Sequence, residues 1–326
     1  MILAVGDLHF HTNTLHIIPS LTREIIRVIH EHHITDVVLL GDTLDRFESI
    51  NMIAWHRSVQ FMETILNHIS GKLYVIIGNH DRINNNEGQT DLSPYYTMKQ
   101  WARVHIIDKV QIIDNMLFVP YLPKNKFNDV IAKIDLTNVV IGFGHQEFQG
   151  CSMGAIVSDS TDVWDYDIPF ISGHIHIKQK LGHVWYPGTP YQQSYSDHHV
   201  RYVLITDKHN ITEVPLTNMI VRQLIKFDYN LKQDIVKQVK AKLQHNIDLK
   251  VEILCPGSLI KSIKKETWYK ELKTINKNTY LLRSPENISP VVQKDIPQLK
   301  NFDQLVLDNL QNNLEAIQLF KDMIQK

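Results

Sequence analysis

The sequence lacks the features that mark disulfide-bonded, membrane-spanning or secreted proteins. Its 326 residues contain two cysteines, Cys151 and Cys255, which lie far apart and form no Cys-x-x-Cys pair. This spacing argues against a disulfide framework and against a zinc site built from thiolates. No uncharged apolar run approaches the roughly 18 residues of a membrane helix, and the amino terminus lacks the positive flank of a signal peptide. We therefore expect an intracellular, cytoplasmic protein without a membrane partner.

The sequence also lacks an excess of either charge. Lysine and arginine together number 34 against 35 aspartate and glutamate residues, so the formal net charge is -1. Because this balance gives no overall attraction to nucleic acid, any DNA binding must depend on local patches. A content of 43% hydrophobic and 21% charged residues is typical of a folded globular chain. Its length predicts one large domain with an appendage, or two domains.

Short apolar runs that end in polar residues recur in the first third of the chain. Residues 2–5, 37–40 and 74–77 are such runs, and each is followed by glycine and then aspartate or asparagine. A helical pattern capped by Ser20 and a second one at about 50–69 separate them. This alternation predicts a layered α/β domain whose ligand sites lie at the carboxyl ends of the strands.

Further along the chain the predicted strands follow one another more closely, which indicates a second sheet packed on the first. These strands are 111–119, 139–143, 170–172, 184–186 and 201–206.

A break is predicted near Pro215, and a small α+β module follows it. The module contains strands at 222–227 and 249–254 around a helix at 231–244. After it come a proline-containing linker and a stripe of leucine and isoleucine at helical spacing. The predicted units are 1–216, 217–283 and 284–326.

Five polar patches follow predicted strands: Asp7-Leu8-His9, Gly41-Asp42-Thr43-Leu44-Asp45, Gly78-Asn79-His80-Asp81, Gly144-His145 and Gly173-His174-Ile175-His176. Each alone is weak evidence, because an Asp-x-His pair after a strand is more often chance than a ligand site. Together they supply carboxylate, imidazole and amide oxygen, which suit borderline divalent metals. Two cations roughly 3.5 to 4 Å apart usually share a carboxylate, and Asp42 is the predicted bridge.

In the same order along the chain, these patches resemble the metal-binding motifs of the calcineurin-like metallophosphoesterases, over about residues 1–207. The resemblance implies a four-layer α/β fold in which two packed β-sheets are flanked by helices. It also implies two divalent metal ions, with manganese expected and magnesium or iron as alternatives. His80 would stay off the metals and protonate the leaving oxygen or stabilise developing charge. The implied ligands are Asp7, His9, Asp42 and His176 for one metal, and Asp42, Asn79, His145 and His174 for the other.

Within that superfamily, the run Tyr-Pro-Gly-Thr-Pro-Tyr-Gln-Gln-Ser-Tyr at 186–195 resembles the SbcD-type nucleases, which include the meiotic recombination eleven family and short phage forms. This resemblance implies a DNA exonuclease and endonuclease in end processing, recombination and repair. It implies an SbcC-like coiled-coil ATPase as partner, a homodimer, a capping module at 217–283 and a terminal helix that docks on the ATPase. Some members have histidine where this chain has Asp45, which leaves open which nuclease activity dominates.

Two other functions remain open from the sequence. One is a phosphatase or phosphodiesterase of the same fold acting on nucleotides, proteins or small phosphoesters. The other is a silent scaffold, which the complete set of metal-capable side chains argues against. Several further residues have both a functional and a structural interpretation: phosphate contact or surface for His11 and His183, an imidazole-orienting or structural role for Asp81, DNA contact or a salt bridge for Arg82, and phosphate contact or a solvated face for Lys261, Lys264, Lys265, Lys270, Lys273 and Lys277.

Overall fold

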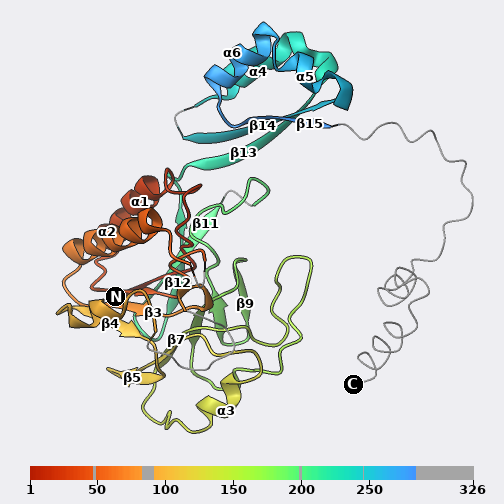
Figure 1. Ribbon diagram of the computed structural model, residues 1–326. Helices are drawn as coiled ribbons and strands as arrows, with labels where there is room; N and C mark the ends of the chain where they lie inside the picture. The colour runs from red at the N-terminus through yellow and green to blue at the C-terminus, as the bar shows by residue number, and fades with distance from the viewer. Residues whose placement is uncertain (47–48, 83–91, 198–199, 245, 284–326) are drawn as a thin grey trace, which may run out of the picture.

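The computed structural model describes residues 1–46, 49–82, 92–197, 200–244 and 246–283 (Figure 1). Two six-stranded sheets pack face to face, and a separate three-stranded sheet with its own helices lies beyond them. The predicted α/β fold of two packed sheets flanked by helices is confirmed. The predicted linker and helix at 284–326 lie outside the described residues.

The first sheet has the strand order β12-β11-β1-β2-β3-β4. Strands β1 to β4 are parallel, and β11 runs antiparallel to β1. Pro215, near which the sequence predicts a break between units, lies in the last strand of this sheet, β12, paired with Tyr202 and one residue before the strand ends at Leu216. Because β12 is an edge strand, the missing amide hydrogen of proline is tolerated there. The strands are β1 Ile2–Val5, β2 Asp36–Leu39, β3 Leu73–Ile76, β4 Val104–Ile107, β11 Arg201–Thr206 and β12 Ile211–Leu216.

Two helices, α1 (Ile18–Glu31) and α2 (Met52–His68), cover the outer face of this sheet (Figure 1). Ser20, predicted as the cap of the first helix, lies inside its first turn and donates its hydroxyl to the Ile17 carbonyl at 2.7 Å. The second helix does have a side-chain cap, because Asn51 Oδ1 accepts from two amides of the first turn. The helices therefore form where the apolar spacing predicts them, and Pro19 lies in the first turn of α1, where its missing amide hydrogen is tolerated.

The second sheet has the order β5-β6-β7-β8-β10-β9, with β6, β7, β8 and β10 parallel. The single strand predicted at 111–119 is a hairpin, because Asp114 and Asn115 adopt positive φ angles of 51° and 64° between β5 and β6. Two consecutive residues of this kind form the tight turn that suits hairpins. The strands are β5 Gln111–Ile113, β6 Met116–Val119, β7 Ile141–His145, β8 Phe170–Gly173, β9 Gln179–Leu181 and β10 Val184–Tyr186.

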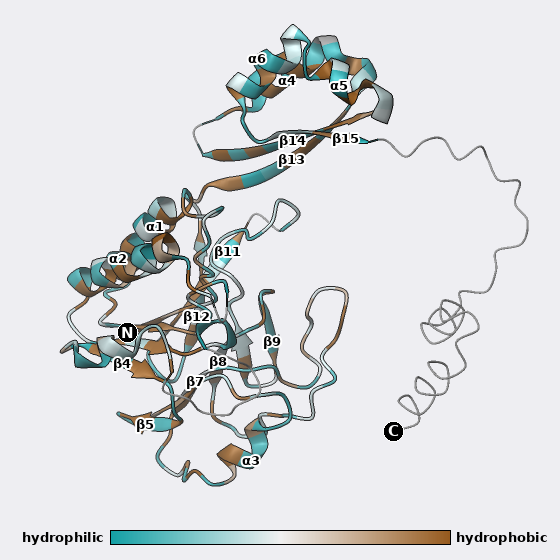
Figure 2. Ribbon diagram, viewed as in Figure 1, coloured by the Kyte–Doolittle hydropathy of each residue, from teal (hydrophilic) through white to brown (hydrophobic). Residues whose placement is uncertain are grey.

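Successive side chains along each strand point to opposite faces of the sheet, which explains how the layers pack. In β1, Leu3 and Val5 face the core beneath the helices, whereas Ile2 and Ala4 face the second sheet. The outer face of the second sheet is covered in part by α3 (Phe127–Ile131). The central parallel strands β1, β3, β6 and β8 are therefore buried on both faces, as parallel strands require. In Figure 2, α1 and α2 each carry both brown and teal residues, as expected of helices with one buried and one exposed face.

The third sheet forms what we call the cap module, residues 221–283. Its three parallel strands have the order β13-β14-β15. Its helices cover the sheet face that points away from the first 216 residues, which we call the main domain (Figure 1). The basic run at 261–277 therefore lies on the far side of the module. The elements are β13 Val221–Asp228, α4 Lys232–Lys242, β14 Ile247–Cys255, α5 Ile260–Ile263, α6 Thr267–Ile275 and β15 Thr279–Arg283.

The described part of the chain has no helix with the length and apolarity needed to cross a membrane.

Candidate metal centre

The five polar patches meet at the edge where parallel strands of both sheets end. Asp7, Asp42 and Asn79 follow β1, β2 and β3 of the first sheet. His145 ends β7 and His174 follows β8 of the second sheet. Because the carboxyl ends of parallel strands lie at one edge, packing the two sheets brings these side chains together.

The metal-capable side chains form three overlapping groups. In each group the potential ligand atoms lie within 4.8 Å of one another. The groups are Asp7, His9 and His176; His9, Asp42 and His80; and Asp42, His145 and His174. Asp42 belongs to two groups and His9 to two, so the three groups form one continuous cluster.

One half of the cluster surrounds His9. Its Nε2 lies 3.0 Å from Nε2 of His176 and 3.7 Å from Oδ2 of Asp42. Asp7 anchors the neighbouring loop, because its Oδ1 accepts the backbone amide of His174 at 2.7 Å. Two imidazoles and two carboxylates from distant parts of the sequence therefore share one small volume.

The other half surrounds the amide oxygen of Asn79. This Oδ1 lies 3.0 Å from His145 Nε2 and 3.0 Å from His174 Nδ1, and Asp42 Oδ1 lies 3.3 Å from the same nitrogen of His145. His145 Nδ1 lies 2.8 Å from the Leu40 carbonyl, to which it can donate. That donation fixes the tautomer and leaves the lone pair of Nε2 facing the cluster.

His80 lies beside the cluster with a fixed ring orientation. Its Nδ1 is 2.5 Å from the backbone oxygen of Asp45, and its own amide donates to Asp42 Oδ1 at 2.9 Å. The other ring nitrogen, Nε2, lies 3.9 Å from Asp42 Oδ2. Because the ring is held through Nδ1, Nε2 faces the space beside the Asp42 carboxylate.

The backbone at this edge adopts conformations that side chains disfavour. His9, Asp42 and His174 have φ angles of 42°, 45° and 77°, in the left-handed region that is strained for residues other than glycine. Gly41 lies next to them with φ of 103°, and an added Cβ there would come within 2.3 Å of His145 Nδ1. Strain of this kind persists where the surrounding structure imposes it and commonly marks functional sites.

Burial and mutual charge perturb the titratable groups. Burial is the largest single effect and opposes ionisation of Asp42, but the imidazoles of His145, His9 and His80 together outweigh it and hold the pKa of Asp42 well below its usual range. Burial likewise opposes protonation of His145, but Asp42 and then Asp7 raise the pKa of His145 to about 9. Burial lowers the pKa of His9 to about 4. Because metal ligation requires neutral imidazole, uptake of a cation at His145 would release a proton.

The residues present fit divalent cations. Among the described residues, Asp7 Oδ2 and His9 Nδ1 are buried polar atoms without a hydrogen-bond partner. A buried carboxylate oxygen without a partner is unfavourable unless a cation compensates it. Carboxylate, imidazole and amide oxygen together form a donor set suited to manganese, iron or zinc.

Asp81 holds two ligand loops together. Its carboxylate accepts the backbone amides of Thr43 at 3.1 Å, Leu44 at 2.9 Å and Gly78 at 3.2 Å. Burial, and then the nearby Asp42 carboxylate, raise the pKa of Asp81 to about 6. Of the two roles considered from the sequence, these contacts favour the structural one, because they bind backbone rather than an imidazole.

The other residues singled out from the sequence lie at different distances from the cluster. Arg82 is buried and donates to the Tyr121 carbonyl at 3.1 Å, next to the cluster rather than on the surface. His11 lies at the rim, with its Nε2 3.9 Å from Asp45 Oδ2. His183 lies between β9 and β10, 55% exposed at its side chain and 3.6 Å from Asp167.

Glu147 is a neighbour of the cluster that sequence reasoning missed. Its Oε2 lies 3.9 Å from Nε2 of His174, and its Oε1 accepts from Ser158 at 2.5 Å. Contact with His174, against the opposing effect of burial, and then Ser158 and Lys124 lower the pKa of Glu147 to about 2. Its position two residues after His145 was the available signal.

The run at 186–195 supports the ligand loops. Gly188 has φ of 74°, and an added Cβ would lie 2.7 Å from the His176 carbonyl. The Tyr191 hydroxyl lies 2.6 Å from the Leu8 carbonyl and 3.0 Å from the His9 carbonyl. The run therefore packs against both loops that carry the ligands around His9.

The same run ends at the cap module. The Tyr195 hydroxyl donates to Asp248 Oδ2 at 2.9 Å. Arg222 binds the same oxygen at 3.1 Å, lies 4.6 Å from the centre of the Tyr195 ring and donates to the Gln193 carbonyl at 2.7 Å. His16 of the main domain reaches Asp248 at 2.9 Å. These contacts fix the module on the side of the molecule that carries the cluster.

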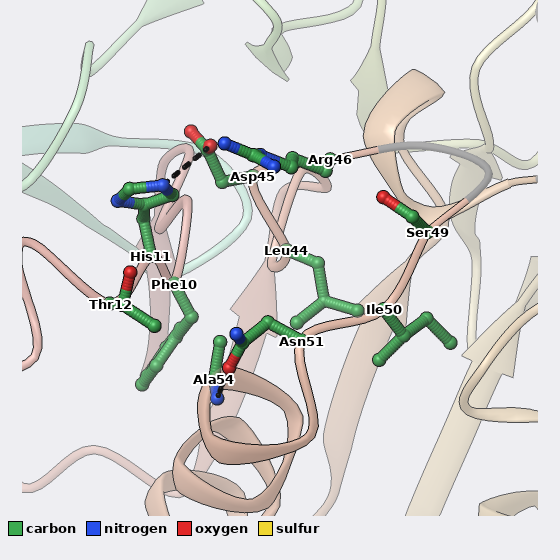
Figure 3. A pocket seen from close by; sticks show the side chains of 10 residues that line it. All are labelled: Phe10, His11, Thr12, Leu44, Asp45, Arg46, Ser49, Ile50, Asn51 and Ala54. Carbon is green, nitrogen blue, oxygen red and sulfur yellow. Dashed lines mark hydrogen bonds and ion pairs between the residues drawn. The ribbon is translucent and has the colours of Figure 1, made fainter.

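Three pockets adjoin the cluster. The first, of 240 Å³, has a floor that includes Phe10 and Leu44, and Figure 3 shows His11 and Asp45 facing each other at its rim. A second, of 540 Å³, is lined by His11 and Asp45 and by Arg222, Leu224 and Lys250 of the cap module. A third, of 950 Å³, begins at His176 and includes Lys178 and Arg201. The third pocket therefore reaches the cluster at His176, and the second connects His11 and Asp45 to the cap module.

The chain is similar to proteins described as phosphoesterases. A family model described as calcineurin-like phosphoesterase matches residues 1–178. The chain is 33% identical over 204 residues to "Putative phosphoesterase 078R" of Invertebrate iridescent virus 3, covering 60% of this chain and 58% of that protein. It is 32% identical over 279 residues to "Putative phosphoesterase 244L" of Invertebrate iridescent virus 6, covering 81% of this chain and 97% of that protein. Among solved structures, the phosphoesterase Yfce from E. coli matches with 11% identity and a TM-score of 0.31, over 66% of this chain and 99% of that one, too distant to support an argument.

Proposed function

Because this chain belongs to the calcineurin-like phosphoesterase family, we propose that its cluster binds two divalent cations, manganese first among them, and hydrolyses phosphodiester bonds in DNA. Asp7, His9, Asp42 and His176 would hold one cation. Asp42, Asn79, His145 and His174 would hold the other. The sharing of Asp42 between two ligand groups is the observation that supports a bridged pair.

The cleft between the rim residues His11 and Asp45 and the cap module supports an extended substrate. It runs from Asp45 and His11 to Arg222 and Lys250 of the module. A polymer with phosphates on both sides of the reacting bond can use such a cleft, because cationic and polar side chains position a nucleic-acid backbone. A small phosphoester would use only the cluster. The likeness of the run at 186–195 to SbcD-type nucleases points to the same substrate.

Each side chain around the reacting phosphate has its own proposed role. When bound, the two cations would polarise the phosphate and activate a water molecule. Asp42 fixes the spacing of the two ligand groups. His80, held through Nδ1 by the Asp45 carbonyl, presents Nε2 toward the substrate and donates a proton to the leaving oxygen. Asp81 keeps the loops of Asp42 and Asn79 in register through their backbone amides.

Competition between substrates tests this proposal. Hydrolysis of a chromogenic bis-ester would be measured with Mn²⁺ in the presence of duplex DNA or of a cyclic nucleotide. We expect DNA to inhibit at micromolar or lower concentration, to be degraded itself, and the cyclic nucleotide to have little effect. The reverse order of inhibition would favour a phosphodiesterase acting on nucleotides or small phosphoesters.

The proposed assembly is a homodimer that acts with an SbcC-like ATPase. Met52 and Ile53 at the start of α2 are 70% and 60% exposed, which supports a subunit contact at about 50–69. The ATPase would bind the segment 302–326, which lies outside the described residues. Deleting this segment should abolish co-purification of the ATPase and leave hydrolysis of the bis-ester unchanged. Co-purification of the ATPase with the shortened chain would contradict this assignment.

A further inference from the structure

We propose that Glu147 is a positioning residue that orients His174 and strengthens its binding of the second cation. This inference rests on the two-cation centre of the proposed function. It concerns a carboxylate that stands behind the ligand and does not itself bind the metal.

The two ring nitrogens of His174 face different surroundings. Nδ1 lies 3.0 Å from Asn79 Oδ1 and 3.2 Å from His145 Nε2, so it points into the cluster. Nε2 points the opposite way and lies 3.9 Å from Glu147 Oε2. An imidazole that gives the lone pair of Nδ1 to a cation carries its proton on Nε2. That proton faces the Glu147 carboxylate.

Glu147 is itself held in place. Its Oε1 accepts the Ser158 hydroxyl at 2.5 Å and lies 3.3 Å from Lys124 Nζ. Both contacts involve Oε1, which leaves Oε2 as the oxygen directed at His174. The side chain is 14% exposed, so water competes little for this carboxylate. A fixed, partly buried carboxylate behind a ligating imidazole raises the basicity of the ligand and fixes its orientation.

The backbone of His174 is held in place, so the remaining freedom is the orientation of its imidazole ring. Its backbone has a φ angle of 77°, and its backbone amide donates a hydrogen bond to the Asp7 carboxylate. Tyr121 packs against one side of the ring, with 5.7 Å between ring centres. Packing restrains tilting, and polar groups distinguish the two nitrogens. Asn79 Oδ1 contacts Nδ1 on the cluster side, and Glu147 places a negative charge 3.9 Å from Nε2 on the opposite side.

A calorimetric titration of metal-free, full-length protein with Mn²⁺ tests the proposal. The wild type should bind two ions. Glu147→Gln keeps the shape and removes the charge, and it should weaken one of the two sites about tenfold, whereas Glu147→Ala should weaken it up to about a hundredfold. The other site should keep its affinity. Any loss in hydrolysis should recover as the Mn²⁺ concentration is raised, which a merely structural defect would not allow.

Glu252→Gln is the matched control. The Glu252 side chain is 10% exposed and also contacts lysine, with Lys250 at 2.7 Å, but it lies in the cap module away from the imidazoles. This variant should bind Mn²⁺ as the wild type does.

The outcomes separate this inference from the proposed function. Wild-type protein that takes up no Mn²⁺ would overturn the two-cation centre and with it the role of Glu147. Two wild-type sites that are unchanged in both Glu147 variants would overturn the role of Glu147 alone. Equal weakening of both sites, together with a lower unfolding temperature of the metal-free variants, would show a general structural role and would also overturn it.

Discussion

Replacing Gly78 by alanine should displace the shared carboxylate without any other direct effect. Gly78 has φ of -82°, a region that alanine adopts freely, so backbone strain plays no part. An added Cβ would lie 2.2 Å from Asp42 Oδ1 and 2.3 Å from the Asp42 nitrogen. Because both contacts are far below van der Waals distance, the carboxylate and its backbone must move together.

The size of the effect follows from that displacement. Relief of the contact requires Asp42 to move by about 1 Å, and a misplacement of this size in a reacting centre lowers rates about a hundredfold. The destabilisation expected from overpacking is about 1–3 kcal/mol, small enough for the domain to remain folded. We therefore expect Gly78→Ala to lose most hydrolysis of a chromogenic bis-ester and to bind Mn²⁺ more weakly at both sites.

Gly257→Ala is the matched control for this experiment. Its φ is not in the left-handed region, and the nearest atoms to an added Cβ belong to the flexible Arg283 side chain, at 2.8 Å. This change should leave Mn²⁺ binding and hydrolysis unaltered, while circular dichroism confirms that both variants fold. Wild-type affinity at both sites and a wild-type rate in Gly78→Ala would refute the placement of Asp42 between the two ligand groups.

Three further outcomes are expected. His80→Ala should lose about 10²- to 10⁴-fold in kcat while calorimetry still detects two bound Mn²⁺ ions. The control His183→Ala should keep full activity. A His80→Ala enzyme with full activity would contradict the proposed role of His80 as proton donor. Burial opposes ionisation of Glu24, but hydrogen bonds, chiefly from Arg27, lower its pKa from 4.5 to about 2, so its carboxylate stabilises the fold above pH 4.5 and ceases to do so as pH falls through 2. Glu24→Gln should therefore cost about 3 kcal/mol in urea unfolding at pH 7 and almost nothing near pH 2, and equal losses at both pH values would contradict this. Lys250→Met, at a cleft-lining lysine whose side chain is 31% exposed, should raise KM for DNA about tenfold and leave that for a chromogenic bis-ester unchanged, whereas parallel increases would argue against a substrate role for the cap module.

Much of the fold could be predicted because the apolar runs in the sequence coincide with the segments that are buried as strands. The apolar runs that became β1, β2 and β3 are buried on both faces, so their sequence pattern is continuous and their ends are marked by glycine. The errors occurred where a local signal has two interpretations. Ser20 reads as a helix cap but lies inside the first turn, and Asp114-Asn115 form a turn inside what reads as one strand.

The candidate site was predictable as a set of residues but not as an arrangement. The order and spacing of the polar patches indicate which side chains belong together, because each follows a predicted strand. Glu147 was missed because its position two residues after His145 is a weak local signal, and its place beside the His174 ring depends on the tertiary structure. The contribution of Tyr195, Asp248 and Arg222 to docking the cap module was likewise hidden, because these residues come from two separate units.

The sequence by itself determined which residues are metal-capable, which segments form strands, and that the polar groups stand at strand ends. These properties depend on residue type and on spacing within a few residues. Only the tertiary structure decided that Nδ1 rather than Nε2 of His174 faces the cluster, that Glu147 lies beside Nε2, and that the cap module presents its sheet to the main domain. Those outcomes depend on how two sheets pack over more than a hundred residues of separation, which local chemistry does not specify.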